Sequence, residues 1–146
     1  MDQTVLWIED DYYNYQGLFR PLQKAGMKVE YALSALEGYK KARNWKNYDL
    51  IVVDIILPLT KDADPMPAEV AKWRNEPYPG VGLVKWLKGE LQATCPIVIL
   101  SVVDDPITNY GLENLGIEAN ISKRAVLPSE LAEKISAILK KPEKGQ

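Results

Sequence analysis

The sequence predicts a doubly wound α/β fold, with five parallel strands in the order 2-1-3-4-5 and helices on both faces of the sheet. Apolar, strand-like runs alternate with segments of helical periodicity about five times along the 146 residues. Two of these runs, Asp49–Leu57 and Pro96–Val103, are almost continuously apolar, which is typical of central parallel strands covered on both faces. Right-handed crossovers between such strands distribute the helices to both sides.

The first 32 residues supply two strands and one helix. Thr4–Ile8 is rich in β-branched and aromatic residues and predicts the first strand. Tyr12–Ala25 predicts a helix that stops at Gly26, and Pro21 predicts a kink or a late start, because proline removes a helical hydrogen bond. Met27–Ala32 alternates as a strand with one wetter face does.

Capping signals place two further helices. Ser34-Ala35-Leu36-Glu37 has the form of a capping box and opens a helix to about Arg43. Asp105-Pro106 reads as an N-cap followed by proline at the first helical position, in a helix to about Leu115. A brief strand is expected near Ile117–Ile121. The last helix is predicted from apolar residues at helical spacing: Leu131, Ile135, Ile138 and Leu139.

The chain length suits one domain, which we expect to span residues 1–141, followed by a polar tail at 142–146. An inserted loop at about 59–79 carries prolines at positions 65, 67, 77 and 79, and one helical turn is expected near Ala68–Arg74. Long loops in compact domains are often functional, but a tolerated surface insertion explains this one equally well.

Composition excludes several classes of function. The net charge of −2 gives no general basic field, so direct DNA binding is not expected. The absence of histidine excludes histidine-based catalysis and histidine metal sites. Cys95 is the single cysteine and cannot form an internal disulfide, and the apolar runs are too short to span a bilayer. We therefore expect a cytoplasmic chain without a membrane segment.

Acidic side chains stand where two strands of the predicted sheet end. Glu9 and Asp10 follow the first strand, Asp54 ends the third, and these strands are neighbours at the switch point, where ligands bind. Clustered carboxylates repel one another unless a cation neutralises them, and oxygen-only ligands suit Mg²⁺. Ser101 ends the fourth strand and Lys123 follows the fifth, so the same edge gathers a hydroxyl and an ammonium.

This set of residues suits phosphoryl transfer. Asp54 interrupts the most apolar run, where a charge is costly unless it is paired or bound to metal. A carboxylate can attack phosphorus to form an acyl phosphate, with Mg²⁺ and Lys123 neutralising the phosphoryl oxygens. Ser101 can donate a hydrogen bond to one of those oxygens. Taken singly, acidic residues at strand ends are as often turn formers or helix caps.

Four segments resemble the receiver (CheY-like) domain of two-component response regulators. They cover nearly the whole chain apart from the inserted loop and the tail, and the 22-residue step from Ser101 to Lys123 matches the spacing usual in that family. The resemblance implies a flavodoxin-like fold and a phosphoacceptor switch rather than an enzyme. The segments are Val5–Asp11, Asp49–Pro58, Pro96–Ser101 and Gly116–Lys123.

The resemblance also implies roles for individual residues. Asp54 would accept a phosphoryl group from a histidine kinase or phosphotransfer protein, and the change of conformation would signal to a downstream protein. Glu9, Asp10 and Asp54, with the backbone carbonyl of Ile56, would hold Mg²⁺. Ser101 would be the switch hydroxyl, and Lys123 would pair with Asp54 or with the phosphoryl group. The resemblance leaves homodimer formation open.

The chain departs from the family pattern in several places. Asn120 stands where the family has its aromatic switch residue, Arg124 replaces the usual proline after the lysine, and Val102 replaces a small residue. In that family, the residues two positions after the phosphoacceptor and two after the switch hydroxyl influence hydrolysis of the aspartyl phosphate. Here they are Ile56 and Val103, whose apolar side chains would not readily orient an attacking water. We therefore expect a comparatively long-lived aspartyl phosphate.

Three other functions compete with a phosphorylated receiver. The departures favour a phosphate-independent, receiver-like protein-interaction domain. A phosphohydrolase with Asp54 as nucleophile is disfavoured, because many such enzymes need a second aspartate where Ile56 stands. A flavin-binding domain is disfavoured because the first loop, Glu9–Tyr13, is acidic and bulky where a phosphate cradle is needed.

Overall fold

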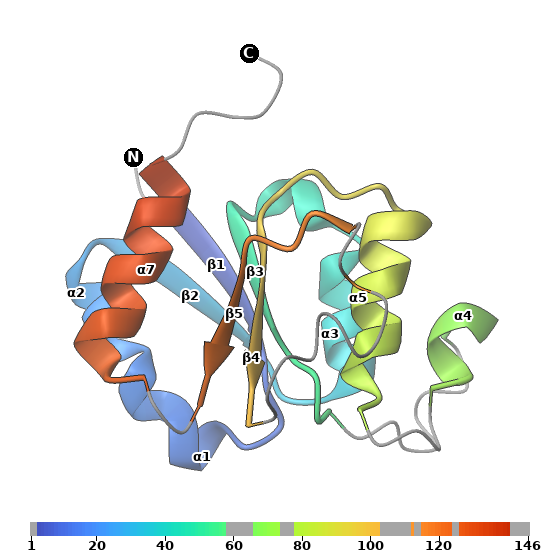
Figure 1. Cartoon of the computed structure of the whole chain (residues 1–146), viewed down its shortest axis with the longest axis horizontal. Coiled ribbons are helices and arrows are strands. Elements are labelled where there is room, and N and C mark those ends of the chain that lie inside the picture. Colours follow the sequence, from blue (N-terminus) through green and yellow to red (C-terminus); the bar gives the residue numbers. More distant parts are fainter. Residues whose placement is uncertain are drawn as a thin grey trace.

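The computed structural model describes residues 3–57, 66–73, 78–102, 112, 115–123 and 126–140. Five parallel strands form one sheet in the order β2-β1-β3-β4-β5 (Figure 1). This confirms the predicted doubly wound, flavodoxin-like topology. The strands are β1 (Gln3–Ile8), β2 (Met27–Ala32), β3 (Leu50–Asp54), β4 (Ile97–Ser101) and β5 (Ala119–Ser122).

Helices cover both faces of the sheet (Figure 1). One face carries α2 (Arg20–Lys24) and α7 (Pro128–Lys140), and the other carries α3 (Ala35–Ala42) and α5 (Gly80–Gly89). The short α4 (Ala68–Ala71) packs against α5, and α1 (Tyr12–Tyr15) lies beyond the carboxyl ends of the strands. Two 3₁₀ turns, η1 (Gln16–Leu18) and η2 (Trp45–Asn47), complete the described elements.

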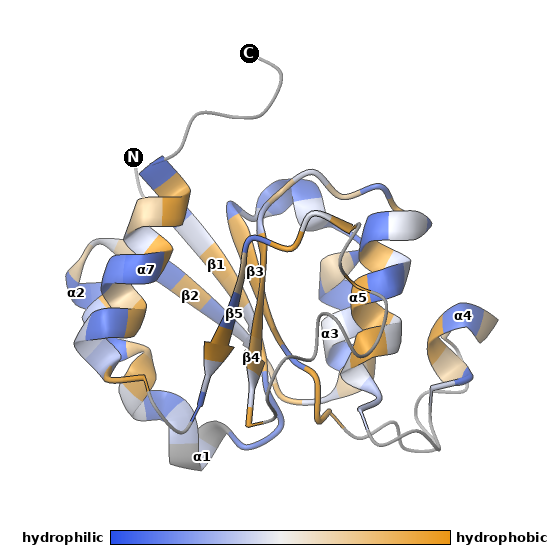
Figure 2. Cartoon of the chain, viewed as in Figure 1, coloured by the Kyte–Doolittle hydropathy of each residue, from blue (hydrophilic) through white to orange (hydrophobic). Residues whose placement is uncertain are grey.

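Two hydrophobic cores lie on the two faces of the sheet, because successive side chains of a strand point to opposite sides. In β1, Val5 and Trp7 belong to the core beneath α2 and α7, whereas Leu6 and Ile8 belong to the core beneath α3 and α5. Every residue of β3 and β4 is buried, which explains the continuous apolar runs (Figure 2). Asp54 is therefore a carboxylate at the end of a fully covered strand.

The predicted helix at Tyr12–Ala25 is divided, as Pro21 indicates. After α1 and the 3₁₀ turn, α2 begins at Arg20, so Pro21 lies in its first turn, where a missing N–H costs no helical hydrogen bond. Gly26 follows with a φ of +91°, a conformation that favours glycine. The segment starts as a helix at Tyr12 but is interrupted before Pro21, in keeping with the expected kink or late start, and the stop at Gly26 is confirmed.

The capping box of α3 is also present. The Ser34 hydroxyl accepts a hydrogen bond of 3.1 Å from the Glu37 N–H, and the Glu37 carboxylate accepts one of 3.0 Å from the Leu33 N–H. The helix ends at Ala42, with Arg43 as its C-cap. Each side chain satisfies a backbone donor that has no partner within the helix.

The remaining elements match the predicted ones only in part. β3 ends at Asp54, as predicted, so the apolar run continues to Leu57 beyond the strand, and the last residue of β1, Ile8, pairs with Val53. The helix α5 has no counterpart among the elements predicted from the sequence. The loop at 59–65 and most of the predicted Asp105–Leu115 helix lie outside the described residues. Among the described helices, none has the length and apolarity needed to cross a membrane.

Candidate functional site

A hollow of about 230 Å³ opens at the carboxyl edge of the sheet, beyond the ends of β1, β3 and β4. Parallel strands deliver their C-terminal side chains to this edge, which is why residues distant in sequence meet there. The residues that line it are Glu9, Asp10, Asp11, Tyr15, Asp54, Ile56, Val102 and Lys123.

Three carboxylates converge in the hollow as the sequence predicts. Glu9, Asp10 and Asp54 each offer an oxygen, and these oxygens lie within 4.8 Å of one another. Glu9 and Asp54 are buried, with only 2% and 3% of their surface exposed, whereas Asp10 faces solvent. The register explains the meeting, because Ile8 pairs with Val53, so that the next residues of β1 and β3 are Glu9 and Asp54.

Lys123 brings its ammonium between the two buried carboxylates. Its Nζ contacts Glu9 Oε1 and lies 3.1 Å from Asp54 Oδ2. Its backbone N–H donates a 2.8 Å hydrogen bond to the Ser101 carbonyl, which fixes the chain just after β5 against the end of β4. The lysine therefore reaches the acidic residues from a firmly anchored turn.

Backbone amides hold the other carboxylate oxygens. The Ile56 N–H donates to Asp54 Oδ1 at 3.0 Å, and the Asp11 N–H approaches Glu9 Oε2 at 3.4 Å. Asp54 thus has an amide on one oxygen and an ammonium on the other. These donors orient the carboxylate within the hollow.

The electrostatics of the site favour an added cation. Burial, followed by the hydrogen bond with Asp54 and its charge, raises the pKa of Glu9 to about 8. Burial opposes the charge of Lys123, but Glu9 and Asp54 outweigh it and raise the pKa of this ammonium above its usual value. The raised pKa of Glu9 shows that one ammonium does not fully balance this cluster of acids, and a divalent ion bound there would displace the Glu9 proton and supply the missing positive charge.

The donor set fits Mg²⁺. Carboxylate oxygens are the ligands that this ion prefers, and a site with one exposed member, Asp10, leaves room for the waters that Mg²⁺ retains. Ile56 lines the same hollow, so its backbone is close to the three acids. The residues present therefore fit the metal that the sequence predicts.

The remaining residues that the sequence singled out lie in different surroundings. Ser101 is fully buried at the end of β4, beside the strand that carries Asp54. Val102 lines the hollow, whereas Asn120 is exposed on β5. Arg124 and Val103 lie outside the described residues.

Sequence reasoning missed Tyr15. The Nζ of Lys123 lies 4.1 Å from the centroid of the Tyr15 ring, within the range of a cation–π interaction. The only available signal was that Tyr15 falls in the helical segment directly after the acidic residues. That position alone does not show which way the ring faces.

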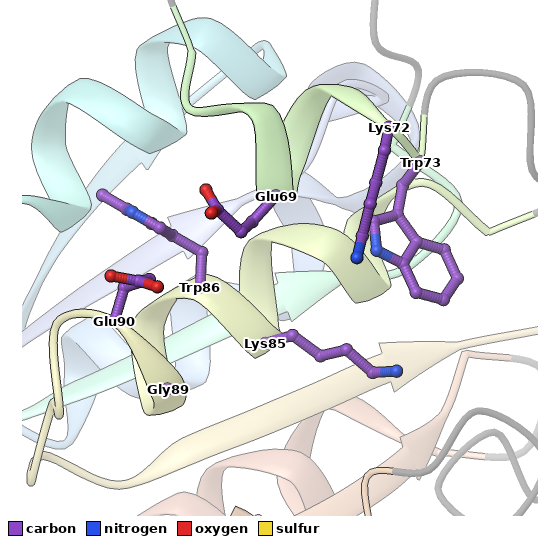
Figure 3. Close-up of a pocket in the computed structure, with 7 residues that line it drawn as sticks. All are labelled: Glu69, Lys72, Trp73, Lys85, Trp86, Gly89 and Glu90. Atoms are coloured by element: carbon purple, nitrogen blue, oxygen red, sulfur yellow. The ribbon is translucent and has the colours of Figure 1, made fainter.

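A second hollow, of about 150 Å³, lies between α4 and α5 (Figure 3). Lys85 holds its Nζ 4.8 Å from the Trp73 ring centroid. The hollow shares no residue with the acidic site and gathers side chains of both charges. Its lining residues are Glu69, Lys72, Trp73, Lys85, Trp86, Gly89 and Glu90.

Comparison with known proteins identifies the fold. No protein-family model and no curated protein matches the sequence. A CheY-like receiver domain protein from Methanospirillum hungatei JF-1 is similar, with a TM-score of 0.71 and 24% identity over 95% of this chain and 94% of that one. The receiver domain of the Francisella response regulator 1452 gives 0.69 and 22% over 94% and 97%.

A response regulator from Thermotoga maritima gives a TM-score of 0.68 and 19% identity over 97% of this chain and 100% of that one. In each of these three comparisons the match covers nearly the whole length of both chains. The chain therefore has the fold of response-regulator receiver domains, as the resemblance of its motifs predicts.

Proposed function

We propose that this chain is a response-regulator receiver domain. It accepts a phosphoryl group on Asp54 in a Mg²⁺-dependent reaction and signals by a change of conformation. The observation that carries the proposal is the meeting of Glu9, Asp54 and Lys123, from the ends of three strands, in one hollow. The domain covers residues 1–141, with the segment at 59–79 as an insertion.

The phosphoryl donor is a phosphohistidine of a histidine kinase or phosphotransfer protein, as the family resemblance implies. A carboxylate oxygen of Asp54 attacks phosphorus, an O–P bond forms, the P–N bond breaks, and the electron pair returns to the imidazole nitrogen. Lys123 and the Ile56 amide, which already touch the carboxylate, stand ready to receive the negative oxygens of the transferred group.

Glu9, Asp10 and Asp54, with the Ile56 carbonyl, would hold the divalent ion. Bound there, it would supply the positive charge that lets a phosphoryl group approach three carboxylates. Ser101 would donate its hydroxyl to a phosphoryl oxygen. Because Ser101 is buried beside β3, a movement of its hydroxyl toward the phosphoryl group must repack the end of β4. This repacking is the conformational signal.

Replacement of Asp54 tests the proposal. With Mg²⁺ and acetyl phosphate, the wild-type chain should gain the mass of one phosphoryl group, and Asp54→Asn should gain none. The matched control is Asp49→Asn, since Asp49 lies just before β3 and accepts a hydrogen bond from the Thr4 N–H that asparagine can also accept. Labelling of Asp54→Asn equal to that of wild type would refute the proposal.

The aspartyl phosphate should be long-lived. Ile56 lines the hollow with 36% of its surface exposed and offers no group that orients a water. Ile56→Asn combined with Val103→Glu should shorten the lifetime by about tenfold. The measurement is the decay of the phosphorylated mass after the donor is removed, and an unchanged lifetime would count against the explanation.

A phosphate-independent interaction domain is the alternative function. Two observations favour it: Lys123 already pairs with the acidic residues, and Val102 lines the hollow where the family resemblance expects a small residue. Such a domain would take up no phosphoryl group under any of the conditions above. The labelling experiment therefore separates the two functions.

A further inference from the structure

The ammonium of Lys123 occupies the place that a divalent ion needs. It contacts Glu9 Oε1 and lies 3.1 Å from Asp54 Oδ2, and these are two of the three carboxylates that form the candidate metal site. A Mg²⁺ ion that draws on Glu9 and Asp54 therefore competes with the ammonium for these two carboxylates. Interactions that stabilise the ammonium only in this position weaken metal binding.

Tyr15 is the third group on that ammonium. Its ring centroid lies 4.1 Å from Lys123 Nζ, and the ring also packs against the core beneath α2 and α7. Packing restricts the ring, so it presents a fixed aromatic face to the ammonium. The lysine side chain is only 6% exposed, and a cation–π contact is strongest when the cation is desolvated in this way.

We propose that Tyr15 is a positioning residue, which holds the Lys123 ammonium in the acidic site until a divalent ion displaces it from Glu9. The inference rests on the proposed metal site and extends it. Tyr15 brings an aromatic ring to Lys123 from α1, whereas Asn120, where the family resemblance expects an aromatic residue, is exposed on β5.

A series of substitutions at Tyr15 tests this through Mg²⁺ affinity, measured by calorimetric titration of the unphosphorylated chain. Tyr15→Phe keeps the ring and should bind Mg²⁺ as wild type does. Tyr15→Leu removes it and should bind about three- to tenfold more tightly, and Tyr15→Trp should bind more weakly. Tyr13→Leu is the matched control, because Tyr13 is 85% exposed on the same short helix.

A second readout follows the lysine itself. The ring should shift the ε-methylene proton resonances of Lys123 upfield in metal-free wild type and in Tyr15→Phe, but not in Tyr15→Leu. A thermal melt establishes that each variant is folded. If Tyr15→Leu fails to fold, the proposal is tested by Tyr15→Trp alone, and this variant must then bind Mg²⁺ more weakly than wild type.

The outcomes separate the two claims. Equal Mg²⁺ affinity in wild type and all folded Tyr15 variants overturns the positioning role while leaving the proposed function intact. Tighter binding by Tyr15→Trp, or weaker binding by Tyr15→Leu, also overturns it. If wild type binds no Mg²⁺ at all, both the proposed function and this inference fail.

Discussion

Replacing Lys123 with methionine will lower the free energy of unfolding by about 3 kcal/mol in metal-free buffer, and Mg²⁺ will restore most of the loss. The ammonium bridges Glu9 and Asp54, which are both buried. Methionine keeps the volume but removes the ammonium, so that the buried Glu9 and Asp54 can lie together only if Glu9 holds a proton, in line with its raised pKa. Because Mg²⁺ binds only the folded site, it should stabilise the variant more than the wild type.

Urea unfolding with a chelator and with excess Mg²⁺ measures both effects. The matched control is Lys85→Met, because Lys85 also lies over an aromatic ring, that of Trp73, without a buried carboxylate pair. That substitution should cost less than about 1 kcal/mol and show no Mg²⁺ dependence. If Lys123→Met loses as much free energy of unfolding in excess Mg²⁺ as it does with the chelator, that result would argue against a metal site at these carboxylates.

Gly80→Ala will destabilise the chain by about 3 kcal/mol and impair phosphorylation of Asp54. A Cβ at Gly80 would lie 2.3 Å from the Asp54 carbonyl oxygen and 2.6 Å from Ile55 Cα, and both neighbours are backbone atoms that cannot move aside cheaply. The Gly80 N–H also donates a 2.8 Å hydrogen bond to the Ile55 carbonyl. The start of α5 is therefore fixed against the strand that carries the phosphoacceptor.

Gly89→Ala is the control on the same helix. No atom lies within 4 Å of a Cβ built at Gly89, which is the exposed last residue of α5. Alanine there should leave stability unchanged or raise it by about 0.5–1 kcal/mol. Thermal melts and acetyl phosphate labelling compare the two variants. Equal stability of Gly80→Ala and wild type would show that the close approach is not a constraint.

The site residues that could be predicted from the sequence are charged side chains in or next to apolar strands. Asp54 stands out because a carboxylate interrupts a buried apolar run, and Glu9 because it ends the neighbouring strand. Lys123 needed its distance from Ser101 and the family resemblance, since a single lysine after a strand carries little information. The parallel topology then brings all three to one edge of the sheet.

Other features depend on distances that the sequence does not encode locally. Tyr15 contacts Lys123 although the two lie in segments far apart in the chain, and neither residue alone indicates that contact. The helix α5 was overlooked because glycines begin it. The structure shows why glycine stands at position 82. The Trp73 side chain, just after α4, approaches α5 so closely that a Cβ at Gly82 would lie 2.5 Å from its ring. Tertiary packing decides such positions over local propensity.

The central claim is that side chains from separate strands form one divalent-ion site beside the phosphoacceptor. A crystal of the unphosphorylated chain soaked in Mn²⁺ and recorded at the manganese absorption edge tests it most directly. We predict a single anomalous peak coordinated by oxygens of Glu9, Asp10 and Asp54, with Lys123 Nζ withdrawn from Glu9. A soaked crystal with no peak there, or with Asp54 outside the coordination sphere, would contradict the account.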